Sequence, residues 1–170
     1  LKGFIITHGR HGPCSAVLCR DSSPTLANCL IVGNRATDPD GAAVLCQHSS
    51  PVFEFCTLAH NIGGPGHAGL RVEQGTVTVS HCIVWDNPAH EIRMGDGGQA
   101  QVSYSVIRFG WPGPHNSNVV PYFAAPGQWI QATPPATGRQ WRAGDYHPMS
   151  QEGHWDVLTR TWTEDNRTSP

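Results

Sequence analysis

The stretch "LANCLIVGN" (26–34) decides the fold of this chain, because near-copies of it recur through the first 110 residues. The copies are "LKGFIITHG" (1–9), "FEFCTLAHN" (53–61), "VSHCIVWDN" (79–87) and, more loosely, "VSYSVIRFG" (102–110). They start 23 to 27 residues apart. A period of this length is typical of repeat architectures, in which each repeat stacks on its neighbours.

A second short apolar run follows four of these copies after a break that contains glycine. These runs are "AVLCRDSS" (16–23), "AVLCQHSS" (43–50), "GLRVEQG" (69–75) and "EIRMGDG" (91–97). Short apolar runs bounded by turn residues predict strands rather than helices. The 19 Gly and 14 Pro residues agree with many tight turns and low helix content.

Side-chain alternation along these strands places equivalent residues of successive copies in the same inward columns. The first wall has Phe4, Cys29, Cys56, Cys82 and Ser105 beside Ile6, Ile31, Leu58, Val84 and Ile107; the second has Val17, Val44, Leu70 and Ile92 beside Cys19, Cys46, Val72 and Met94; the third has Leu1, Leu26, Phe53, Val79 and Val102. Three short walls per repeat predict an all-β fold, a right-handed parallel β-helix, which is a single-stranded solenoid of about five coils. A β-sandwich is the alternative fold, although it would not repeat columns at a fixed spacing.

The composition changes after residue 112, which predicts coils over 1–112 and a Pro/Trp-rich, irregular tail over 113–170. Seven prolines lie between 112 and 148, and four of the six Trp residues lie in this tail. Proline disfavours helix and interior strand. Because the outward columns of the first wall are also apolar, we expect the tail to dock on the solenoid.

Asparagine closes the same strand in three successive copies, at Asn34, Asn61 and Asn87. Asparagine can adopt a left-handed conformation and bond the backbone of a turn, and stacked amides can bond one another. This column could serve a ligand, but a structural role is the better interpretation.

The six cysteines show no CxxC spacing, which disfavours a zinc ribbon. Five of them fall in the inward columns and Cys14 falls in a turn. Side-by-side Cβ vectors on parallel strands suit a disulfide poorly. Buried thiols that pack as small apolar groups are the favoured interpretation, with disulfides and a metal site as alternatives.

The phrases "NCLIVGN" (28–34), "GAAVLCQHSSP" (41–51) and "VSYSVIRFGWPG" (102–113) resemble secreted right-handed parallel β-helix repeat proteins of environmental bacteria, relatives of the pectate-lyase-like superfamily. The tail phrase "GDYHP" (144–148) is similar to a "DYHL" phrase that follows the last coil in such proteins, with Pro148 in place of Leu. The resemblance implies an extracellular or cell-surface location and no cofactor. We also expect this chain to be part of a longer one.

Polysaccharide lyases and glycoside hydrolases share this superfamily, so the resemblance also raises an enzymatic function. Such lyases need clustered carboxylates that hold Ca²⁺, and hydrolases need paired carboxylates. The sequence shows no Asp-Asp pair and no acidic column, and the pairs Arg71/Glu73 and Glu91/Arg93 read as a solvated ionic face. We therefore expect no catalysis in this segment. The alternative is that the chain is a fragment of a polysaccharide lyase or a glycoside hydrolase. Only a lyase would require Ca²⁺ as a cofactor.

Binding is the better-supported function class. Guanidinium groups and an aromatic ring on flat sheets can grip sugar chains, and His60 and Asp86, one coil apart, could form an ion pair or a weak metal site. The candidate ligand-binding residues are Arg71, Trp85, Arg93, Arg108, His60 and Asp86. No catalytic residue and no metal site are assigned.

The overall charge favours no polyanionic partner. The net charge is -2 and no run approaches the roughly 20 apolar residues that span a bilayer. The sequence thus predicts a non-catalytic module with a polysaccharide as partner, without nucleic acid and without membrane insertion.

Overall fold

The computed structural model describes residues 1–133, 138–149, 154–156 and 161–164. The chain divides into two units, Leu1–Asn118 and Val119–Pro170, and each is described by itself. The described residues form strands, turns and irregular segments. Among them there is no helix that could cross a membrane.

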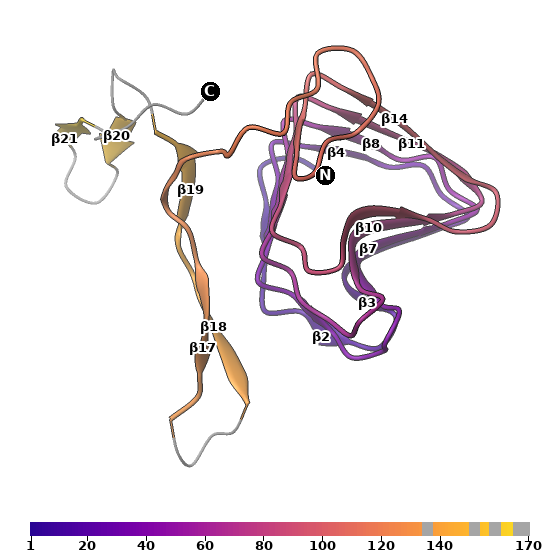
Figure 1. The fold of residues 1–170 in the computed structure, drawn as a ribbon, viewed down its shortest axis with the longest axis horizontal. Helices are drawn as coiled ribbons and strands as arrows, with labels where there is room; N and C mark the ends of the chain where they lie inside the picture. The colour runs from indigo at the N-terminus through magenta and orange to yellow at the C-terminus, as the bar shows by residue number, and fades with distance from the viewer. Residues whose placement is uncertain (134–137, 150–153, 157–160, 165–170) are drawn as a thin grey trace. The chain divides into compact units, whose positions relative to one another are not determined.

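The first unit is a parallel β-solenoid of about four turns, with three walls of stacked strands (Figure 1). The first wall contains β1 (Ile5–Ile6), β5 (Leu30–Val32), β9 (Thr57–Ala59), β12 (Ile83–Trp85) and β15 (Val106–Ile107); the second contains β3 (Cys14–Arg20), β7 (Ala42–Gln47), β10 (Ala68–Glu73) and β13 (His90–Met94); the third contains β4 (Thr25–Ala27), β8 (Val52–Glu54), β11 (Gly75–Ser80) and β14 (Gly98–Ser103). A short extra pair joins β2 (Arg10–His11) and β6 (Arg35–Ala36). The predicted all-β, parallel β-helical class is confirmed, with about four turns in place of the predicted five coils, and its right-handed sense stays a prediction.

The strand register stacks equivalent residues of successive coils. Leu58 pairs with Ile31 on one side and with Val84 on the other, and Cys46 pairs with Cys19 in the same way. The core that results is a single cluster of apolar side chains from all three walls. Two predictions of inward-facing side chains are wrong: Leu1 and Phe4 are 54% and 53% exposed, because they lie in the outermost coil of the described stack.

The coil turns sharply at three corners, and each corner uses residues with positive φ. Gly33, His60 and Asp86 have φ between 54° and 64° at the corner that follows the first wall. The expectation that the asparagines take the left-handed conformation is therefore wrong, because it falls on the residue before each of them. Asn34, by contrast, uses its side chain to bond the neighbouring coil.

The described residues of the second unit include three short antiparallel pairs, joined by irregular segments. The pairs are β16 (Phe123–Ala125) with β19 (Asp145–Pro148), β17 (Gln128–Gln131) with β18 (Arg139–Arg142), and β20 (His154–Asp156) with β21 (Thr161–Thr163). Trp129 lies opposite Trp141, with ring centroids 5.4 Å apart. The docking of residues 113–170 on the solenoid stays a prediction.

Candidate functional site

The six predicted ligand-binding residues fall into two separate places on the solenoid. Arg71 and Arg93 are paired in register on adjacent strands β10 and β13 of the second wall. The other four lie at the ends of first-wall strands: His60 follows β9, Trp85 ends β12 and is followed by Asp86, and Arg108 follows β15. The prediction from sequence therefore grouped residues that belong to two separate sites.

The two arginines of the second wall line an open groove of about 610 Å³. The other lining residues are Glu73, Gln74, Met94, Gly95 and Asp96, from β10, β13 and the turns that follow them. The groove runs across neighbouring coils, so strand spacing of about 4.8 Å sets the distance between its equivalent positions.

Ion pairs hold both guanidinium groups in place. Arg71 Nη2 lies 2.6 Å from Glu73 Oε1, which confirms that pair. Arg93 Nη1 lies 2.9 Å from Asp40 Oδ1 and also donates to the carbonyl of Gly66 at 2.7 Å. The predicted pairing of Arg93 with Glu91 is wrong, because Arg93 reaches a loop instead. The Arg93 guanidinium lowers the pKa of the Asp40 carboxyl.

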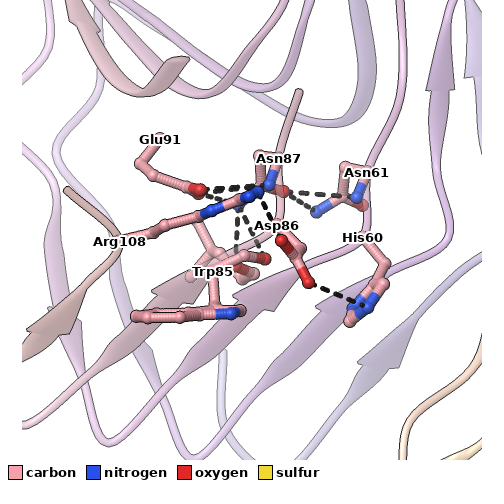
Figure 2. A network of polar contacts seen from close by, with 8 residues as sticks. His60, Asn61, Trp85, Asp86, Asn87, Glu91 and Arg108 are labelled. Carbon is pink, nitrogen blue, oxygen red and sulfur yellow. Dashed lines mark hydrogen bonds and ion pairs between the residues drawn. The ribbon is translucent and has the colours of Figure 1, made fainter. Parts of the chain in front are cut away.

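The second place is a polar network around Asp86 (Figure 2). Asp86 Oδ2 lies 3.5 Å from His60 Nε2, as predicted for a pair one coil apart, and Asp86 Oδ1 accepts a hydrogen bond from Arg108. Burial lowers the pKa of His60, and the Asp86 charge opposes this while Arg108 adds to it. Trp85 is only 9% exposed, so its ring offers little area to a ligand.

A ladder of buried asparagine side chains runs next to this network. Asn34 Nδ2 donates to Asn61 Oδ1 at 2.9 Å, and Asn61 Nδ2 donates to Asn87 Oδ1 at 2.9 Å. The backbone amides of Asn34 and Asn61 donate in the same direction, each to the asparagine side chain of the next coil. All three residues are at most 2% exposed. The ladder satisfies buried polar groups, which supports the structural interpretation.

Glu91 ends this ladder, and sequence reasoning missed its role. Asn87 Nδ2 donates to Glu91 Oε2 at 2.6 Å, and the backbone amide of Asn87 donates to the same carboxyl. Glu91 is 5% exposed, so it does not belong to a solvated face. Burial raises its pKa to about 7, against the lowering effects of Asn87 and Arg108.

A signal for Glu91 was present in the sequence. The copy over 102–110 has Gly110 where a fourth asparagine would stand. Asn87 therefore needs an acceptor from elsewhere, and Glu91, four residues on, carries the first carboxylate that follows it in sequence.

The cysteine column forms a second ladder at another corner. The backbone amide of Cys29 donates to Cys56 Sγ at 3.5 Å, and that of Cys56 donates to Cys82 Sγ at 3.3 Å. The Cys82 amide then donates to Ser105 Oγ at 3.1 Å. All six cysteines are free thiols. These thiols are hydrogen-bond acceptors as well as core filling.

Aromatic rings stack on the outside of the same corner. Phe55, His81, Tyr104 and His115 follow one another with ring centroids 4.7 to 5.0 Å apart. Phe55 and Tyr104 are 58% and 52% exposed. His81 and Tyr104 have a stacked ring on both faces, so mainly their edges face solvent. Because a sugar ring packs on the face of an aromatic ring, this column is a poor platform for a sugar.

Comparisons with models of protein families, with curated proteins and with solved structures find no match to this chain. Within the described residues, no group of three or more His, Cys, Asp or Glu side chains is placed to hold a metal ion.

Proposed function

We propose that this chain is a non-catalytic β-solenoid module that binds a polysaccharide in the groove of Arg71 and Arg93. The observation that carries the proposal is the register pairing of these two arginines on adjacent strands, inside an open groove of about 610 Å³. A linear polymer has regularly spaced polar groups, so it can meet equivalent side chains of successive coils.

The charges of the groove favour a neutral sugar chain. Two arginines are balanced by Glu73 and Asp96 in the lining, and Asp40 pairs with Arg93 from a neighbouring loop. With Asp40 counted, two positive and three negative side chains leave a net charge of -1, so this surface offers fixed donors and acceptors without an excess of positive charge. Hydroxyl groups, which both donate and accept, match it better than carboxylates do.

The extracellular or cell-surface location and the kinship with bacterial pectate-lyase-like proteins belong to the same proposal. Both rest on the resemblance of phrases such as "NCLIVGN" (28–34). The stacking of those phrases in a parallel solenoid supports the resemblance at the level of architecture.

A fragment of a polysaccharide lyase or glycoside hydrolase is the second candidate function, and one observation favours it. Glu91, with a pKa of about 7, has the protonation behaviour of a general acid. However, Glu91 is buried and its carboxyl accepts hydrogen bonds from Asn87, which gives it a structural task. We therefore place binding first.

Affinity electrophoresis with neutral and acidic polysaccharides tests the proposal. We expect retardation by a neutral polymer such as xylan or glucomannan, and a loss of affinity of at least about tenfold in R71Q and R93Q. R10Q is the matched control, because Arg10 is exposed on the same solenoid but away from the groove lining. Retardation only by polygalacturonate would refute the neutral ligand, and no retardation by any polymer would refute the binding function.

An activity assay on the same polymers separates the two candidate functions. We expect no new reducing ends and no unsaturated products, with or without added Ca²⁺. Product formation that E91Q abolishes would overturn the non-catalytic assignment.

A further inference from the structure

The last strand of the second wall, β13, carries both Glu91 and part of the groove. Arg93 and Met94 of this strand line the groove, two and three residues after Glu91. Among the strands of the described residues, β13 pairs with β10 alone and lies at the end of its sheet. A terminal strand of this kind opens more readily than an inner one.

Glu91 ties β13 to the end of the asparagine ladder. Its carboxyl accepts hydrogen bonds from the side chain and the backbone amide of Asn87. Gly69 of β10 packs against both: a Cβ at Gly69 would lie 2.7 Å from Asn87 Cγ and 2.9 Å from the Glu91 carbonyl oxygen. Glu91 itself is 5% exposed, so its carboxyl has little access to water.

Two charged groups face this carboxyl from neighbouring elements. Asp86, after β12, disfavours a negative charge on Glu91, and Arg108, after β15, favours it. Arg108 also bonds Asp86, and His60, after β9, contacts the far oxygen of Asp86. From β10, the residue that packs on this site is Gly69, which carries no charge. Arg108 thus compensates Asp86, and little compensation remains for an ionised Glu91.

We propose that Glu91 is a proton-operated lock on β13: the neutral carboxyl holds the strand closed, and the ionised carboxylate favours its opening. The consequence for ligand affinity rests on the proposed function, because it concerns the groove side that Arg93 supplies. The lock itself is a property of the solenoid and stands apart from any ligand.

The cost of charging a buried carboxyl supplies the driving force. Neutral Glu91 keeps an oxygen that accepts from Asn87 and needs no hydration. Burial disfavours ionised Glu91 by more than the two Asn87 donors favour it, and local opening of the terminal strand hydrates the carboxylate. A folded pKa of about 7 against an ordinary value of 4.5 shifts the opening equilibrium by about a hundredfold between pH 5 and pH 8.

Hydrogen exchange of the backbone amides of β13, measured at pH 5 and pH 8 and corrected for intrinsic exchange, tests the lock. In the wild type we expect protection of β13 to fall by about a hundredfold at pH 8. In E91Q, an amide oxygen still accepts from Asn87 and no charge forms, so protection should be equal at both pH values. E54Q, a matched change at a half-buried glutamate on β8, should behave as the wild type does.

Equal protection of wild-type β13 at pH 5 and pH 8 would overturn the lock, and so would the same pH response in E91Q. Direct titration of the Glu91 carboxyl by carbon NMR in the unaltered protein gives a check that needs no variant. Polysaccharide affinity at the two pH values separates the proposals. If the hydrogen exchange of β13 depends on pH in the wild type but not in E91Q, and no polymer binds at either pH, the lock stands and the proposed function fails.

Discussion

The backbone amide of Ser105 donates a hydrogen bond to Asn116 Oδ1 at 3.1 Å, and this contact ends the corner ladder that begins with the cysteines. Asn116 Nδ2 in turn donates to the carbonyls of Val102 and Trp111. One side chain thus takes the place that the next coil would occupy. Residues after the last coil therefore close the solenoid by imitating a further coil.

The variant N116A should lower the free energy of unfolding by about 1–3 kcal/mol, because it leaves the Ser105 amide and two carbonyls without this partner. Urea unfolding of the whole chain measures the change. N118A, two residues away at an exposed position, is the control and should cost nothing measurable. Equal stabilities of the two variants would show that Asn116 does not close the solenoid.

At the cysteine column, hydrogen bonding should outweigh hydrophobicity. Cys82 Sγ accepts from the Cys56 amide, and a serine already does the same work one coil later at Ser105. C82S keeps an acceptor, whereas C82V removes it and leaves a buried amide unpaired. We expect C82V to be less stable than C82S by about 1–2 kcal/mol. If C82V is the more stable in thermal unfolding, the thiols act only as apolar filling.

His67 should make the fold sensitive to acid. Its ring is 0% exposed, and burial lowers its pKa to about 4, although the backbones of Asn61 and Gly41 act in the other direction. A histidine with a lowered folded pKa contributes stability that is complete above the ordinary value of 6.5 and is lost as pH falls toward 4. The loss amounts to about 3 kcal/mol across this range.

Glu91 acts with the opposite sign, so the two residues should offset each other in the wild type. Its folded pKa is raised, which means that the fold gains stability as pH falls from 7 to 4.5. We expect E91Q to lose stability on acidification and H67F to gain it, in urea unfolding at pH 4.5, 5.5 and 6.5. H48F, at an exposed position, should follow the wild type. If the free energy of unfolding changed with pH in the same direction in E91Q and H67F, the assigned burial of these two groups would be contradicted.

Much of the fold followed from short-range rules. Cys29, Cys56 and Cys82 could be placed in one inward column because side chains alternate along a strand and the copies repeat at a nearly constant spacing. The same rules correctly joined His60 with Asp86, since both stand at the same point of adjacent coils. They failed for Leu1 and Phe4 in the outermost described coil, because alternation gives the direction of a side chain and not whether a neighbouring coil covers it.

The candidate site was less accessible to such reasoning. Arg93 was expected to pair with Glu91, two residues away, but it reaches Asp40, which is 53 residues away in sequence. Glu91 was taken for a surface charge, although the corner of the coil turns its carboxyl toward Asn87. In both cases the partner lies in a loop or at a corner, outside the strands, where simple alternation no longer predicts the direction of a side chain.

The amino-acid sequence by itself determined that this protein is a stack of parallel strands, because period and alternation are local properties that each copy carries independently. Only the tertiary structure decided which polar groups meet across coils, and therefore where the groove lies and that Glu91 is buried. The physical reason is that each such contact depends on the turn geometry of two coils at once. No single copy of the repeat contains that information.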